Sequence, residues 1–300
     1  MSPASQALII DALAAAGLPD GVVNYLTCAP EDAPALGESL IAHPAVRRVN
    51  FTGSTPVGRI IARTCGQYLK PAVLELGGKA PLLVLDDADL EQAAAGALFG
   101  SFANAGQICM STERIIVDES IAEAFIALLS RRAATLPAGL MGPVADMKTV
   151  TRCNALIDDA LAKGARLLTG GKADTTQMRA TLLDGVTRSM RIWQEESFGP
   201  VKAIIRVQDE QEALTVANES EYGLSSAVYS RDTARAWNVA QRLQTGICHI
   251  NGPTVHDEAQ MPFGGCKASG YGRFGGRAGV AEFTELRWIT LQTSPRELPF

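Results

Sequence analysis

One cysteine stands where a thiol could act as a nucleophile. Cys109 ends the run Gly-Gln-Ile-Cys at 106–109, where a helical pattern stops and the chain turns. A free thiol is only slightly ionised at pH 7, so a nucleophilic cysteine needs help from a helix dipole or from backbone N–H groups. The alternative for Cys109 is the ordinary role of a small buried apolar residue.

A carboxyl side chain earlier in the sequence could serve as a base. Glu75 lies in the apolar stretch 72–76, directly before a Gly-Gly-Lys sequence. An isolated carboxylate in an apolar strand is costly unless it is paired or its raised pKa has a use. At the carboxyl end of a strand it would face the crevice where α/β sheets bind ligands, and one crossover could bring it to Cys109. A salt-bridged structural glutamate is the alternative.

A third segment has the features of a phosphate-binding turn. Residues 46–59 predict a strand that turns into a helix at Gly53, with Thr52 or Ser54 as the cap and Pro56 in the first turn. Gly53 permits close approach of a ligand, and the helix N-terminus attracts a pyrophosphate. The segment has neither the usual Rossmann fingerprint nor a Walker lysine, and simple helix capping is the alternative.

The elements that must position these residues alternate along the chain. Helices are expected at 5–17, 31–42, 55–68, 89–102, 119–134, 145–163, 209–218 and 231–243, and strands at 22–26, 46–52, 72–76, 81–85, 114–117, 201–207, 225–230, 248–250 and 286–292. Alternating strands and helices predict right-handed crossovers and a largely parallel sheet. The fold class is therefore α/β.

Composition excludes several classes of protein. The 300 residues are 47% hydrophobic and 20% charged, with 27 basic and 32 acidic side chains. No basic stripe favours nucleic acid, no apolar run is long enough for a membrane, and the start lacks the basic region of a signal peptide. The six cysteines and three histidines show no metal-ligand spacing. We expect a cytoplasmic protein without a metal site.

Six motifs, in order along the chain, together resemble the aldehyde dehydrogenase superfamily. They are FTGST at 51–55, LELGGK at 74–79, GQIC at 106–109, EESFGPV at 195–201, PFGGCKASGYGR at 262–273 and RWIT at 287–290. The resemblance implies that Cys109 is the nucleophile and that Glu75 activates the water that releases the acid. It also implies NAD as the cofactor, with NADP as the alternative.

The resemblance assigns further residues to the cofactor and substrate. Leu76 matches a position at the nicotinamide end, Glu196 and Phe198 match residues that hold the nicotinamide ribose and ring, and Phe263 matches an aromatic residue of the substrate tunnel. The segment that matches the pyrophosphate contact consists of Gly53, Ser54, Thr55, Pro56, Val57 and Gly58.

The implied reaction passes through covalent intermediates on the cysteine. The thiolate attacks an aldehyde to give a thiohemiacetal, hydride passes to the nicotinamide, and water activated by Glu75 hydrolyses the thioacyl group. The branch that transfers its acyl group to coenzyme A typically lacks this glutamate, so the hydrolytic branch is implied. Residues 250–265 and 272–276 resemble dehydrogenases of salicylaldehyde, vanillin and benzaldehyde, which implies an aromatic substrate.

The alignment of these motifs also predicts the domain organisation. Residues 1–77 would be the C-terminal part of an incomplete Rossmann-like nucleotide-binding lobe, 78–284 an α/β catalytic domain, and 285–300 an oligomerisation strand of a homodimer or homotetramer. The N-terminal portion, with an oxyanion-hole asparagine and several strands, is expected to be missing or to be a second polypeptide. We therefore expect a weakly active or inactive fragment with an exposed apolar strand edge.

Two other classes of function remain open. The chain could be a catalytically inactive binding or structural protein that keeps the fold, although the presence of Cys109, Glu75 and Glu196 argues against it. It could be an unrelated thiol hydrolase, which would need a histidine partner for the cysteine. His43, His249 and His256 offer no obvious partner.

Overall fold

The computed structural model describes residues 3–300, and the chain forms two compact units. One comprises Met1–Val49 and Arg63–Pro71, and the other comprises Asn50–Ala62 and Ala72–Phe300. Helix α3 (Thr55–Gln67) contributes residues to both.

The smaller unit has little apolar core of its own. It contains helices α1 (Pro3–Ala15) and α2 (Ala33–Ala42). Among its described residues only Ile41 and Cys65 are buried, while Leu8 and Ile9 of α1 are 69% and 62% exposed. Because burial of apolar surface is the main force that drives folding, these contacts stabilise the unit only weakly.

The larger unit includes a small sheet that carries Glu75. Its strands run in the order β1 (Val49–Thr52), β2 (Ala72–Glu75) and β12 (Gly270–Tyr271), so β1 is an edge strand among the described residues. Strand β12 is antiparallel to β2, with Gly270 opposite Glu75. Gly270 has φ +108, and a β-carbon there would clash with the Leu74 carbonyl oxygen, so this close pairing requires glycine.

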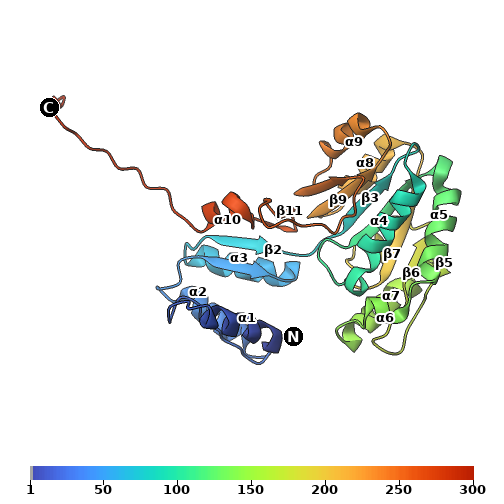
Figure 1. The fold of residues 1–300 in the computed structure, drawn as a ribbon, viewed down its shortest axis with the longest axis horizontal. Coiled ribbons are helices and arrows are strands. Elements are labelled where there is room, and N and C mark those ends of the chain that lie inside the picture. The colour runs from blue at the N-terminus through green and yellow to red at the C-terminus, as the bar shows by residue number, and fades with distance from the viewer. Residues whose placement is uncertain (1–2) are drawn as a thin grey trace. The chain divides into compact units, whose positions relative to one another are not determined.

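A seven-stranded sheet forms the core of the larger unit, in the order β10-β9-β3-β4-β7-β6-β5 (Figure 1). All neighbouring strands are parallel except β5 and β6, which confirms the predicted largely parallel α/β sheet. The strands are β3 (Ala80–Val84), β4 (Thr112–Asp118), β5 (Arg166–Thr169), β6 (Thr181–Asp184), β7 (Val201–Val207), β9 (Ser225–Tyr229) and β10 (Ile247–Ile250).

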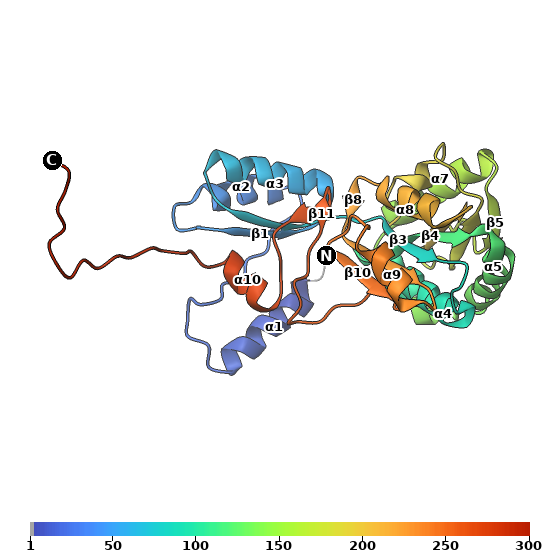
Figure 2. The same cartoon turned by 90° about the horizontal axis from the view of Figure 1, so that it is seen from above.

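Crossover helices cover both faces of this sheet. Helices α4 and α5 lie side by side on one face, and α8 lies on the opposite face (Figures 1 and 2). Five helices begin directly after an aspartate whose side chain accepts backbone N–H groups of the first turn, which satisfies donors that the helix leaves unpaired. They are α4 (Leu90–Phe102), α5 (Glu119–Ala134), α7 (Met147–Ala162), α8 (Glu210–Asn218) and α9 (Thr233–Ala240).

Short elements complete the unit. They are η1 (Ala103–Gly106), α6 (Ala138–Met141), η2 (Arg191–Trp193), β8 (Tyr222–Gly223), β11 (Cys266–Lys267) and α10 (Gly276–Glu282). No helix within residues 3–300 is long and apolar enough to cross a bilayer.

Two predicted strands are not formed. Residues 22–26 are bend and coil, and residues 285–300 follow α10 as an extended tail without helix or strand (Figure 1). Both segments are rich in strand-forming residues, but a strand needs a hydrogen-bonded neighbour, and the structure gives them none. Leu286, Trp288 and Leu291 of the tail are 106%, 90% and 87% exposed.

Candidate active site

The candidate site is built from turns that precede three neighbouring strands. Gly77–Lys79 lead into β3, Cys109 leads into β4, and residues 195–200 lead into β7. Because β3, β4 and β7 are adjacent and parallel, their amino ends meet at one edge of the sheet. Glu75 thus lies at the carboxyl end of its strand β2, whereas Cys109 lies at the amino edge of the larger sheet.

Left-handed backbone conformations shape the turn that carries Cys109. After α4, residues Asn104, Ala105 and Gly106 have φ values of 51, 55 and 71. Such conformations are strained for residues other than glycine and persist where the surroundings enforce them. A β-carbon at Gly106 would clash with the Gly199 carbonyl oxygen, so the turn packs directly on the 195–200 segment.

The structure brings Glu75 and Cys109 together. The Glu75 side chain is 3% exposed, and neither of its carboxyl oxygens has a conventional hydrogen-bond partner among the described residues. Burial raises the pKa of Glu75, and an interaction with the Cys109 thiol partly offsets that rise. The two groups therefore interact, although no hydrogen bond joins them. The salt-bridged alternative for Glu75 is not what the structure contains.

The Cys109 thiol is held in its protonated form. Burial raises its pKa, and the negative charges of Glu75 and, more weakly, Glu196 raise it further. The Met110 backbone N–H favours the thiolate, as expected for a nucleophile, but it is outweighed. Attack by this sulfur therefore requires transfer of its proton to an acceptor.

Two glycines let Glu196 and Cys109 approach the segment after β2. A β-carbon at Gly78 would clash with the Cys109 carbonyl oxygen, and one at Gly77 would lie 2.8 Å from Oε2 of Glu196. The Gly78 N–H donates to Oε1 of Glu196 at 2.9 Å. Burial nevertheless raises the pKa of Glu196 to about 7, so its charge changes near neutral pH.

The predicted phosphate-binding turn lies at the start of α3. Gly53, Ser54, Pro56 and Val57 are exposed, while Thr55 is buried. The Thr55 hydroxyl donates to the Ala268 carbonyl at 3.0 Å, which ties the first turn of the helix to the loop before β12.

Leu76 connects this turn to the thiol region. Its side chain is 4% exposed and packs so closely on α3 that a β-carbon at Gly58 would clash with it. The Gly53 N–H donates to the Glu75 carbonyl at 3.0 Å. The predicted pyrophosphate turn and the predicted base therefore share one small sheet.

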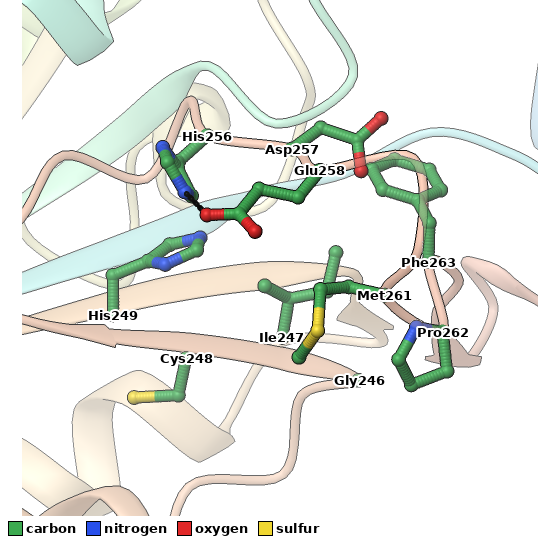
Figure 3. Close-up of a pocket in the computed structure, with 10 residues that line it drawn as sticks. All are labelled: Gly246, Ile247, Cys248, His249, His256, Asp257, Glu258, Met261, Pro262 and Phe263. Carbon is green, nitrogen blue, oxygen red and sulfur yellow. Dashed lines mark hydrogen bonds and ion pairs between the residues drawn. The ribbon is translucent and has the colours of Figure 1, made fainter. Parts of the chain in front are cut away.

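Phe198 and Phe263 are placed in different surroundings. Phe198 has φ 43 and a side chain that is 39% exposed. Phe263 lines a cavity of about 360 Å³ together with His249 and His256, whose rings lie 5.2 Å apart (Figure 3). Neither Cys109 nor Glu75 is among the residues that line this cavity, so the predicted place of Phe263 beside the nucleophile stays a prediction.

The sequence interpretation missed the buried charges behind the site. Arg114 in β4 is 1% exposed and donates to the carbonyls of Lys79, Val216 and Ala217. Lys79, Glu113 and Lys202 are equally buried. The sequence does indicate these buried charges, because charged residues interrupt the apolar runs at 112–118 and 201–207. Within residues 3–300 no group of three His, Cys, Asp or Glu side chains is placed to hold a metal ion.

The fold and site define an α/β protein with a half-buried thiol next to a buried carboxyl group, beside a candidate nucleotide-binding turn. The model of the aldehyde dehydrogenase family matches residues 1–289. The chain is 59% identical over 306 residues to a vanillin dehydrogenase of Pseudomonas fluorescens, a match that spans 100% of this chain and 64% of the relative. It is 39% identical over 302 residues to benzaldehyde dehydrogenase [NAD(+)] of Pseudomonas putida, spanning 98% of this chain and 61% of the relative.

A solved structure shows the same similarity in three dimensions. The crystal structure of a salicylaldehyde dehydrogenase from Pseudomonas putida G7, complexed with salicylaldehyde, superposes with a TM-score of 0.98 at 49% sequence identity. The match covers 100% of this chain and 63% of that one. The chain belongs to the aldehyde dehydrogenase family. It spans less than two thirds of the length of these relatives.

Proposed function

We propose that the protein to which this chain belongs oxidises an aromatic aldehyde to its carboxylic acid with NAD or NADP as the electron acceptor. The observation that carries the proposal is the coupling between the Cys109 thiol and the buried Glu75 carboxyl. A thiol that needs a proton acceptor and a carboxyl whose pKa is raised are complementary, because the raised pKa strengthens Glu75 as a base.

The cofactor fits the residues that surround this pair. The exposed first turn of α3 offers a helix N-terminus to a pyrophosphate, with Gly53 allowing close approach. Leu76 is the buried apolar neighbour of that turn, and Glu196 has a carboxyl group able to accept hydrogen bonds from ribose hydroxyls. Phe198 offers an exposed aromatic face to a nicotinamide ring. When bound, the nicotinamide supplies a hydride acceptor.

The residues of the chain divide the covalent chemistry between them. The Cys109 thiol passes its proton to Glu75, which releases it to solvent, and the sulfur bonds to the aldehyde carbon, while the Cys109 backbone N–H is a donor for the resulting oxyanion. After oxidation of the carbon, Glu75 takes a proton from water. The hydroxide adds to the thioester carbonyl, the carbon–sulfur bond breaks, and the acid and the free thiol are released.

The names of the relatives support an aromatic substrate. Dehydrogenases of vanillin, salicylaldehyde and benzaldehyde all act on an aldehyde attached to a benzene ring. We further propose residues 1–77 as part of the cofactor lobe, 78–284 as the catalytic domain and 285–300 as a subunit-pairing segment of a homodimer or homotetramer. The exposed apolar side chains of this tail support the last assignment. The cytoplasm is the proposed location.

Two substitutions test the chemistry in the purified protein. Cys109→Ser should abolish NADH formation from vanillin or benzaldehyde, since a neutral hydroxyl is a far weaker nucleophile than a thiolate. Glu75→Gln should slow turnover about 100-fold or more, because the thiol lacks its proton acceptor and deacylation lacks its base. The matched control is Cys28→Ser, at an exposed cysteine of the smaller unit. Wild-type rates in either active-site variant would overturn that residue's role.

A further inference from the structure

Three charged side chains are buried together behind the candidate site. The side chains of Lys79, Glu113 and Lys202 are 0%, 2% and 0% exposed. Nζ of Lys79 lies 2.8 Å from Oε2 of Glu113, and Nζ of Lys202 lies 2.8 Å from Oε1. Buried charges are costly unless they are paired and fully hydrogen-bonded, so such a triad needs a reason beyond stability.

A β-bulge directs Glu113 toward this position. Ala80 of β3 is opposite Thr112 of β4, but the next residue, Pro81, is opposite Arg114, so Glu113 is an extra residue in β4. Bulges re-aim side chains and occur often beside functional sites. On the other side of β4, Arg114 is opposite Ala203, which brings Glu113 next to the amino end of β7.

Glu113 also binds the loop before β7 directly. The Ser197 backbone N–H donates to Oε2 of Glu113 at 3.0 Å, and the Ser197 hydroxyl donates to Oε1 at 2.6 Å. Lys79 donates to the Glu195 carbonyl at 2.6 Å. Burial opposes ionisation of Glu113, but the charges of Lys202 and Lys79 outweigh it and lower its pKa to about 2. The acceptor is therefore a full carboxylate at neutral pH.

The anchored residue lies between the two side chains that we assign to the cofactor. Ser197 separates Glu196 from Phe198, and Phe198 is held at φ 43. A bulky residue adopts this left-handed conformation only where its neighbours enforce it. The hydrogen bonds of Ser197 to Glu113 supply that constraint from one side of Phe198.

We propose that Glu113 is a positioning residue that holds the 195–199 loop, and with it Glu196 and Phe198, in the conformation that binds the cofactor. Glu113 touches neither substrate nor cofactor and acts through Ser197. Lys79 and Lys202 keep its carboxylate ionised in the core. The expected effect on cofactor binding rests on the proposed function. The anchoring of the 195–199 loop by Glu113 does not.

The test distinguishes the loss of the loop's anchor from the loss of charge balance among the buried side chains. Glu113→Gln leaves two buried lysines without a counter-charge, so it removes the ionic anchor and also destabilises the fold. The double variant Glu113→Gln with Lys202→Met restores the original net charge of the cluster and should recover much of the stability, but it does not restore the carboxylate at Ser197. Glu119→Gln, at the exposed start of α5, is the matched control.

Two readouts are measured on the full chain. Hydrogen–deuterium exchange of peptides that cover 195–199 should be faster in both Glu113 variants than in wild type and in Glu119→Gln. NADH titration should show affinity weakened about 10- to 100-fold in both, since losing one hydrogen bond between a cofactor and a charged carboxyl group costs this much. Urea unfolding reports the recovery of stability in the double variant.

The possible results bear either on the positioning role of Glu113 or on the proposed function. Unchanged exchange at 195–199, or a double variant that recovers loop protection and NADH affinity along with stability, would overturn the positioning role. Faster exchange with unchanged NADH affinity would also overturn it, because the loop would then not position cofactor groups. A wild-type protein that does not bind NADH would count against the proposed function, and the exchange experiment would still test the anchor.

Discussion

Replacing Glu196 with glutamine should stabilise the fold at alkaline pH relative to wild type and change it much less in acid. Burial raises the pKa of Glu196 from an ordinary value of 4.5 to about 7. Because the folded protein holds this proton more tightly, the unfolded chain loses it first as the pH rises. Wild-type stability therefore falls, relative to the variant, as the pH increases from about 4.5 to about 7, and the difference is constant above that range.

The size of the effect follows from the two pKa values. A difference of one pKa unit corresponds to about 1.4 kcal/mol, so the change from 4.5 to about 7 corresponds to about 3 kcal/mol. Glutamine resembles the protonated carboxyl in shape and keeps an oxygen that can accept the Gly78 N–H. The free energy of unfolding of the variant, minus that of wild type, should thus increase by about 3 kcal/mol between about pH 4.5 and pH 8.5.

Urea unfolding, followed by tryptophan fluorescence at a series of pH values, measures this difference. Glu195→Gln is the control, since that neighbouring side chain is 45% exposed, pairs with Arg191, and has a lowered pKa. Its contribution is lost only as the pH falls through that lowered pKa, so its difference from wild type should be small and flat above pH 5. The reasoning is refuted if the Glu196→Gln difference is equally flat, or favours wild type at high pH.

Two further substitutions test the close packing behind the thiol. Gly78→Ala should destabilise the protein by about 1–3 kcal/mol and alter the rate at which iodoacetamide alkylates Cys109, because the new methyl group clashes with the Cys109 carbonyl oxygen; an unchanged alkylation rate would contradict this packing. Arg114→Met should cost about 3 kcal/mol or more in urea unfolding, because three backbone carbonyls lose their buried donor. Arg231→Met, at a side chain that is 72% exposed, should be nearly neutral, and equal effects of the two would refute the assignment.

Local signals in the sequence predicted most of the large helices and the parallel sheet. An aspartate precedes each of five helices, and apolar runs such as 81–85 and 201–207 coincide with buried strands. Residues 22–26 and 286–292 form no strand in the single chain, because strand-forming residues make a strand only where a partner is available, and pairing is not a local property. The antiparallel strand β12 was missed for the same reason, since its two residues pair with strand β2, which lies far away in the sequence.

The candidate site, like the fold, could be predicted only in part from local sequence signals. Cys109, Glu75 and Glu196 stand out in the sequence because each belongs to a motif of polar residues and glycine, and the structure brings the three together. The Glu113 triad did not stand out. Glu113 lies 34 residues from Lys79 and 89 residues from Lys202, so nothing local shows that this carboxylate pairs with both lysines. Only the strand order and the bulge bring them into contact.

The β-bulge at Glu113 affects how substitutions in the large sheet act on the candidate site. Strands β3, β4 and β7 each lead directly out of a segment of the candidate site. A slip of one residue along β4 would move Cys109 by about 3.3 Å and turn its neighbours to the opposite face of the sheet. Substitutions deep among the apolar residues of these three strands can therefore impair the thiol without unfolding the protein. Conversely, the loops that follow β3, β4 and β7 leave the far, carboxyl edge of the sheet and can change length with little effect on the chemistry.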